Sequence, residues 1–184
     1  MSAAIQRFSP AQRVLHWLMA VCIIAMLFIG VGMVSTVAPA YLQLVSIHKP
    51  LGIAILILAV LRLAVRLRLG APPLPLDMPP VMKLAARLSH YAFYVLMLAL
   101  PLIGWAMLSA ADYPVMVLGL HLPPIVPADP SLHSALWKAH QFLALAFFAL
   151  ILLHLAAALF HAWVRRDGVF ESMASVSAGQ RNSD

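Results

Sequence analysis

The stretch AHQFLALAFFALILLHLAAALFHAWV, residues 139–164, decides the fold. It contains no Asp, Glu, Lys or Arg and exceeds the roughly 20 residues that one helix needs to cross a bilayer. It nevertheless holds three histidines, His140, His154 and His161. A polar ring inside a hydrocarbon span is retained chiefly where it has a partner or a function. The stretch therefore predicts a membrane-spanning helix with a functional site built on it.

The composition of the whole chain also indicates a membrane protein. Of its 184 residues, 64% are hydrophobic and 10% are charged, whereas an ordinary soluble domain is about 45–50% apolar and about 25% charged. A soluble fold must cover its surface with groups that water solvates, and this chain has too few of them. The net charge of +6 then bears on membrane topology, and we expect no nucleic-acid partner.

The hydrophobic runs predict an all-α bundle of four transmembrane helices, at about 14–34, 47–68, 88–111 and 137–164. Together they form one domain, 1–173, followed by a polar tail at 174–184. Four spans place both termini on one side of the membrane. Ten of the twelve Lys and Arg residues fall on that side, and only Lys49 and Lys138 fall on the other. The positive-inside rule therefore predicts cytoplasmic termini.

Helical spacing places two of the histidines on one face. His140 and His154 are fourteen residues apart, which is 40° short of four full turns and about 21 Å along the helix axis. A low-spin haem iron takes two axial ligands, commonly histidines. Depth in the membrane selects His48 as the partner of His140 near the outer surface, and His16 as the partner of His154 toward the inner surface. The sequence thus predicts two stacked haems.

The haems must be held non-covalently, because the single cysteine, Cys22, excludes a C-x-x-C-H attachment motif and a zinc cluster. Their propionates need charge compensation inside a membrane. Lys49, Lys138 and Arg62 are the candidates, and ordinary anchoring at the membrane surface is the alternative for all three. Arg62 is the deepest charge, fourteen residues beyond His48 and on the same helical face.

Spacing alone leaves other histidines open. His161 lies seven residues beyond His154, on nearly the same face and level with His16, so it competes with His154 as a ligand. His90 is interpreted as a structural or propionate-contacting residue. His121 and His133 lie in the long outer loop, where exposure to solvent is the simplest expectation.

Several motifs occur in an order that resembles a known family. The chain is similar to the bacterial cytochrome b561 family of four-helix di-haem proteins over residues 8–173. The motifs are Leu15-His16-Trp17, Ile47-His48 followed by Gly52, Leu61-Arg62-Leu63, Leu100-Pro101-Leu102-Ile103-Gly104, and His154 followed by an alanine run to His161.

This resemblance implies ligation of one haem b by His16 and His154 and of the other by His48 and His140, which favours His154 over His161. It further implies a multi-pass protein of the bacterial inner membrane that passes electrons between the quinone pool, with ubiquinone as redox partner, and a donor or acceptor. One class of the family oxidises superoxide at the outer face. Related cytochrome b subunits of hydrogenases and formate dehydrogenases serve a dedicated catalytic partner.

The leading hypothesis is therefore electron transfer through two haems, with no catalytic side chain that makes or breaks covalent bonds. No nucleophile, acid pair or phosphate-binding loop points to other chemistry. A second hypothesis makes the protein an enzyme, a superoxide- or quinol-linked oxidoreductase with a substrate site beside the outer haem. A third is a haem-free, proton-coupled transporter that uses its histidines as a proton relay.

The distribution of basic residues makes the orientation testable. A reporter domain fused after Arg166 should be active only in the cytoplasm, and one inserted near Pro127 only outside it, because Lys and Arg resist translocation. Reporter activity measured in intact cells checks both positions. The reversed pair of activities would contradict the predicted orientation.

Overall fold

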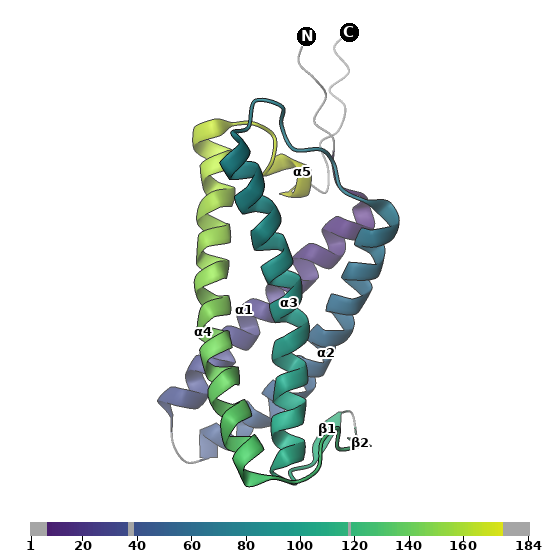
Figure 1. The fold of residues 1–184 in the computed structure, drawn as a ribbon, viewed down its shortest axis with the longest axis vertical. Helices are drawn as coiled ribbons and strands as arrows, with labels where there is room; N and C mark the ends of the chain where they lie inside the picture. Colours follow the sequence, from purple (N-terminus) through teal and green to yellow (C-terminus); the bar gives the residue numbers. More distant parts are fainter. Residues whose placement is uncertain (1–6, 37–38, 118, 175–184) are drawn as a thin grey trace.

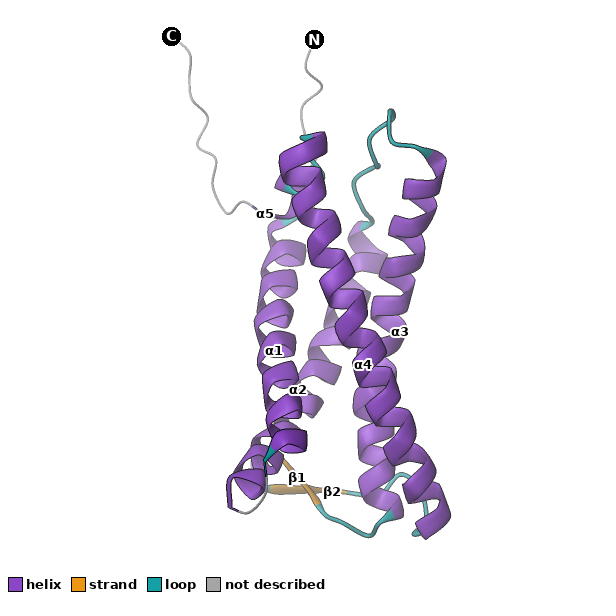
Figure 2. Ribbon diagram, turned by 90° about the vertical axis from the view of Figure 1, so that its left-hand side faces the viewer, coloured by secondary structure: helices purple, strands orange, loops and turns teal. Residues whose placement is uncertain are grey.

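The computed structural model describes residues 7–36, 39–117 and 119–174, which form four long helices (Figures 1 and 2). These are α1 (Pro10–Ser35), α2 (Pro39–Leu69), α3 (Pro80–Ala110) and α4 (Pro130–Phe160). A π-helical turn, η1 (His161–Arg165), extends α4, and the short helix α5 (Glu171–Ala174) follows. Each long helix begins at a proline, which is favoured there because the first N–H groups have no partner within the helix.

All four helices are long and apolar enough to cross a membrane. They extend beyond the spans that hydrophobicity alone marks. Helix α2 begins at Pro39 rather than near 47 and continues through Pro50, and α3 begins at Pro80 rather than near 88. Pro39 and Pro80 lie in the first turn of their helices, where a proline costs no hydrogen bond, whereas Pro50 lies inside α2 and removes one backbone donor. Arg181 and the rest of the predicted polar tail beyond 174 lie outside the described residues.

The helices alternate in direction and pack in sequence order. Helix α1 packs on α2, α2 on α3, and α3 on α4. The start of α1, the loop between α2 and α3, and α5 lie at one end of the bundle (Figure 1), which we call the termini end. The opposite end holds two short antiparallel strands, β1 (Val115–Val117) and β2 (Leu120–Leu122), and we call it the hairpin end.

The core of the bundle is a single packed layer at mid-height. Each long helix contributes one buried residue to it: Met19 from α1, Ala59 from α2, Met97 from α3 and Phe147 from α4. Phe147 lies midway between His140 and His154 in the sequence of α4. We call these four residues the central layer, and it separates the two ends of the bundle.

The outer surface of the helices is strongly apolar. Phe28 on α1 is 75% exposed and Leu145 on α4 is 69% exposed, and many other large apolar side chains face outward. In water such a surface would favour aggregation, whereas in a bilayer it contacts lipid chains. The helical form also satisfies the backbone hydrogen bonds that lipid cannot. The exposed faces therefore agree with the membrane assignment from composition.

Side-chain hydrogen bonds to backbone carbonyls connect the helices at the termini end. The carbonyl of Gly70, just after α2, accepts from Gln12 Nε2 at 2.8 Å and from Arg66 Nη1 at 3.1 Å. Trp17 Nε1 on α1 donates to the carbonyl of Met173 in α5 at 3.1 Å. These bonds fix the start of α1 against both α2 and the C-terminal segment.

The hairpin end forms an ordered cap over the bundle. Asp129 caps α4 by accepting from the N–H groups of Ser131 and Leu132, and its own N–H donates to Ala110 at the end of α3. Trp105 Nε1 on α3 donates to the carbonyl of Pro123 at 3.1 Å. The loop is thereby held over the ends of α3 and α4.

Candidate functional site

Two histidine pairs face each other across the bundle, one on each side of the central layer. His48 on α2 lies opposite His140 on α4, with ring centres 6.2 Å apart and planes inclined by 65°. His16 on α1 lies opposite His154 on α4, with ring centres 6.4 Å apart and planes inclined by 70°. Both pairs are those that membrane depth selects in the sequence. Helix α4 supplies one ring to each pair.

The two separations match ligation of one metal by both rings. A metal–imidazole bond is about 2 Å long and the ring nitrogen lies about 1 Å from the ring centre, so two rings on opposite sides of one metal have centres about 6 Å apart. Imidazoles that hydrogen-bonded directly to one another would lie closer. The spacing therefore suits an atom held between each pair.

The histidine pair at the hairpin end has ring nitrogens without hydrogen-bond partners. His48 Nδ1 is buried without a hydrogen-bond partner among the described residues. His140 Nδ1 is likewise buried without a hydrogen-bond partner among the described residues, and the ring lies near the backbone of Leu100. A buried, unsatisfied nitrogen is unfavourable unless a ligand or partner uses the ring.

Gly104 on α3 gives the ring of His140 its space. A Cβ at this position would lie 3.4 Å from His140 Cε1 and 3.6 Å from Nδ1, so Ala would just contact the ring and only a side chain longer than that of Ala would displace it. The sequence analysis treated Gly104 only as part of a family motif. Its position three residues after Pro101, at the depth of His140, was the signal that it borders the site. Together with the unsatisfied nitrogens, this space fits the b-type haem that the resemblance implies.

His161, the rival to His154, is engaged elsewhere. Its Nδ1 lies 2.8 Å from Asp167 Oδ2, and Arg165 Nε donates to the same oxygen at 2.9 Å. Burial raises the pKa of Asp167, but the hydrogen bonds from Arg165 and His161 outweigh burial and lower it. Helix α4 stays α-helical as far as His161, whose N–H donates to the carbonyls of Ala157 and Ala158, so His161 keeps the face of His154 but lies about 10 Å further along the helix axis. The ring that lies opposite His16 belongs to His154.

The structure also brings His90 to the site at the termini end. Its ring centre on α3 lies 6.2 Å from that of His154, with planes inclined by 66°. Phe93, one turn further along α3, contacts His154 with ring centres 5.1 Å apart. The rings of His16 and His90 therefore both lie at a metal-sharing distance from His154. Distance alone does not choose between them.

The three basic residues predicted to compensate propionate charge do not all lie at the same end of the bundle. The charge of Arg62 on α2 acts on the rings of His16, His90 and His154, so it belongs to the site at the termini end. Lys49 follows His48 at the hairpin end, and its Nζ donates to the carbonyl of Pro114 at 3.4 Å. Lys138 is exposed on α4.

The two histidines that the sequence analysis assigned to the outer loop, His121 and His133, have different surroundings in the structure. His133 does not simply face solvent, because its Nδ1 lies 2.9 Å from the carbonyl of Met107 and joins α4 to α3. His121 on β2 is exposed, as expected, and it lines a cavity at the hairpin end.

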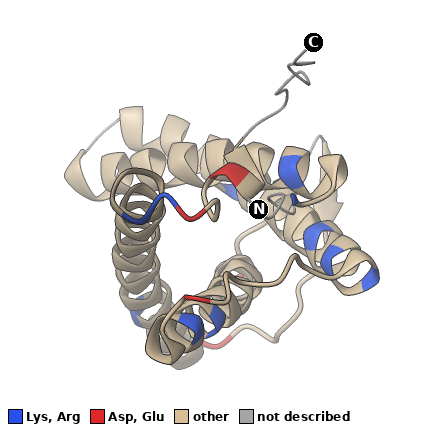
Figure 3. Cartoon of the chain, turned by 90° about the horizontal axis from the view of Figure 1, so that it is seen from above, with Lys and Arg blue, Asp and Glu red and all other residues tan. Residues whose placement is uncertain are grey.

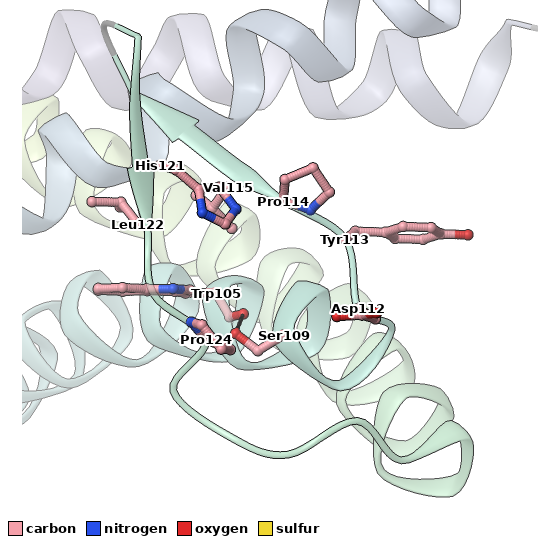
Figure 4. A pocket seen from close by; sticks show the side chains of 9 residues that line it. All are labelled: Trp105, Ser109, Asp112, Tyr113, Pro114, Val115, His121, Leu122 and Pro124. Carbon is pink, nitrogen blue, oxygen red and sulfur yellow. Dashed lines mark hydrogen bonds between the residues drawn. The ribbon is translucent and has the colours of Figure 1, made fainter.

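That cavity has a volume of about 180 Å³ and lies between the end of α3 and the hairpin (Figure 4). Asp112, Tyr113 and His121 supply its titratable groups. Trp105 and Val115 also line the space around His48 and His140. The sequence analysis did not identify this cavity, because its walls come from a helix end and a hairpin whose packing is not local. All nine lining residues are labelled in Figure 4.

Comparison with known proteins identifies the family. A family model described as prokaryotic cytochrome b561 matches residues 7–175. The chain belongs to this family. It is accordingly a multi-pass protein of the bacterial inner membrane, and family membership implies b-type haem and electron transport.

Named relatives cover most of the chain. Cytochrome b561 homolog 1 of Escherichia coli K12 is 29% identical over 175 residues, 91% of this chain and 96% of the relative. Cytochrome b561 homolog 2 of the same organism is 29% identical over 177 residues, 94% of each chain. A protein of Yersinia pestis named probable superoxide oxidase CybB is 34% identical over 133 residues, 72% of this chain and 76% of the relative.

The histidine geometry leads to a prediction about ligand loss. His154→Ala and His16→Ala should each remove one haem or convert it to high spin, because each variant removes an axial nitrogen. His161→Ala, on the face of α4 that carries His154, and His90→Ala, on α3, are the controls and should retain two low-spin haems. Haem content per chain and absorption spectra of the purified variants check this. Loss of a haem in His161→Ala or His90→Ala, with full retention in His154→Ala or His16→Ala, would show that the pairing is wrong.

Proposed function

We propose that the protein is a di-haem b-type cytochrome that carries electrons across the cytoplasmic membrane and exchanges them with the quinone pool. The observation that supports this proposal most strongly is the pair of facing imidazoles on each side of the central layer, with both sites sharing α4. In each pair the two rings lie at a distance that suits a shared metal, and one ring of each pair comes from α4. This arrangement suits two redox centres in series across the bilayer.

In this proposal His48 and His140 hold the haem at the hairpin end, and His16 and His154 hold the haem at the termini end. The haems supply reversible one-electron chemistry, and the protein sets their potentials through ligands, burial and nearby charge. Among the basic candidates, Arg62 compensates propionate charge at the termini end and Lys49 and Lys138 do so at the hairpin end. The choice of His16 over His90 rests on the family motif that contains His16.

In this arrangement the central layer separates the two haem sites. Met19, Ala59, Met97 and Phe147 are buried and apolar, so they exclude water between the two sites and fix their separation. Phe147 also packs against Phe93, with ring centres 5.8 Å apart. Close packing holds such a layer rigid. The termini end then faces the cytoplasm, in agreement with the positions of the basic residues.

The decisive test is the haem content of the purified, folded protein. We expect two haem b per chain in a pyridine haemochrome assay, with low-spin absorption bands in both oxidation states, because each site has two imidazole ligands. A folded, colourless preparation would refute the proposal and favour the haem-free transporter. One haem per chain would refute the second site.

A second candidate is superoxide oxidation at the hairpin end, with quinone as the electron acceptor. The name of the Yersinia relative and the position of Lys49 beside His48 and His140 favour it. A positive field at this surface would raise the encounter rate of a small anion, and salt would weaken that effect.

Stopped-flow reduction by superoxide at several ionic strengths tests this candidate. The rate should fall with salt in the wild type, and Lys49→Gln combined with Lys138→Gln should be slower and less sensitive to salt. Slow reduction that responds neither to salt nor to these substitutions would exclude superoxide as the donor and leave the electron carrier intact.

A further inference from the structure

Residues 166–174, which we call the C-terminal segment, turn back from the end of α4 across the termini end of the bundle (Figure 1). The reversal uses positive φ angles of 52° at Arg166 and 78° at Gly168. Asp167 lies between these two residues. Three groups lie at hydrogen-bond distance from its carboxylate: His161 Nδ1, Arg165 Nε and the N–H of Val169. This carboxylate therefore sets the direction in which the chain leaves α4.

The C-terminal segment joins the end of α4 to the start of α1 through two hydrogen bonds. Trp17 Nε1 donates to the carbonyl of Met173 at 3.1 Å, and the N–H of Phe8 donates to the carbonyl of Ser172, also at 3.1 Å. Helix α1 packs along α2 and hardly approaches α4. At the termini end, these two bonds therefore connect α1 to the chain that continues α4.

His16 lies between two points at which α1 is held. On one side of it, Met19 packs in the central layer with Phe147 of α4. On the other side are the bonds to the C-terminal segment, and Trp17 contacts the His16 ring with ring centres 5.4 Å apart. If α1 were held toward α4 only at the central layer, it could tilt about that point. The position of the His16 ring therefore depends on the C-terminal segment.

His90 reaches His154 without the help of this segment. It lies on α3, which packs directly along α4. Its ring centre is 6.2 Å from that of His154, compared with 6.4 Å for His16. When the C-terminal segment is released, the separation of His90 from His154 should therefore persist, whereas that of His16 from His154 should not.

We infer that the C-terminal segment selects His16 rather than His90 as the ring that shares a haem iron with His154. The inference rests on the proposed di-haem function and makes Trp17 and Asp167 positioning residues for one of its ligands. With the segment bound, α1 is held toward α4 and His16 takes the ligand position. With the segment released, α1 tilts away and His90 is the alternative ligand.

Trp17→Phe combined with Asp167→Ala tests the first step in the full-length protein. This released variant lacks the indole donor and the carboxylate that sets the turn. Amide hydrogen exchange at the start of α1 should become faster than in the wild type, because the N–H of Phe8 loses its fixed partner. Unchanged exchange would show that these bonds do not hold α1 and would overturn the inference. This measurement does not depend on haem.

Adding His16→Ala or His90→Ala to each background then identifies the ligand. In the wild type, His16→Ala should cost the low-spin haem at the termini end, and His90→Ala should not. In the released variant, the ratio of His16 to His90 ligation should fall about fivefold, the equilibrium value of one lost hydrogen bond. His90→Ala should then cost low-spin haem and His16→Ala should cost less of it. The low-spin signal per chain in electron paramagnetic resonance spectra of the ferric protein measures this.

Trp105→Phe combined with Asp129→Ala is the matched control at the hairpin end. Trp105 Nε1 also donates to a carbonyl at 3.1 Å, and Asp129 also accepts from backbone N–H groups. The control should leave exchange at the start of α1 unchanged, and His90→Ala should stay silent in it. An equal dependence on His90 in the control would indicate general loosening of the bundle and would overturn the inference.

The outcomes separate this inference from the proposed function. A folded wild-type protein without haem refutes the proposed function. A haem-loaded released variant in which His90→Ala stays silent refutes the selection of His16 by the C-terminal segment and leaves the electron carrier intact. Loss of the same haem from the released variant itself, whether or not His90 is present, shows that His90 is no alternative ligand and also refutes the selection.

Discussion

The structure depends on the cost of placing imidazole rings inside a hydrocarbon layer. A neutral ring carries one donor and one acceptor, and lipid satisfies neither, so each buried histidine requires a partner. In this chain the partners of His140 and His154 are rings from other helices, at a distance that leaves room for a metal. The four helices are thereby arranged around two sites rather than around one continuous apolar core.

The central layer lies between the two histidine pairs and divides the bundle into two ends. Phe147 lies on α4 between His140 and His154 and packs with one residue from each of the other helices. Figure 3, which looks along the bundle, shows the four helices arranged around a common centre. Because close-packed interiors resist deformation, the layer keeps the spacing of the two histidine pairs constant. An electron crossing the bilayer would pass through packed side chains and not through water.

The two ends of the bundle differ in chemistry. At the termini end, Asp167 joins His161 to Arg165, and Arg165 also contacts Asp77 at 3.2 Å, but the basic residues at this end far outnumber these acids. At the hairpin end, Asp112 and His121 line an open cavity beside the histidine pair. The basic residues are therefore concentrated at one end of the bundle, and a cavity with acidic and imidazole groups lies at the other.

The sequence by itself determined the four apolar helices, the membrane setting and the shared face of His140 and His154, because these depend on composition and on the fixed geometry of one helix. Tertiary structure decided which rings meet. Spacing could not separate His154 from His161, since both lie on one face of the same helix and only their contacts, with His16 and with Asp167, distinguish them. Nor could it show that His90 approaches His154, that Gly104 makes room for His140, or that the hairpin encloses a cavity. Those features depend on the rotation and tilt of neighbouring helices, which no periodicity along a single helix encodes.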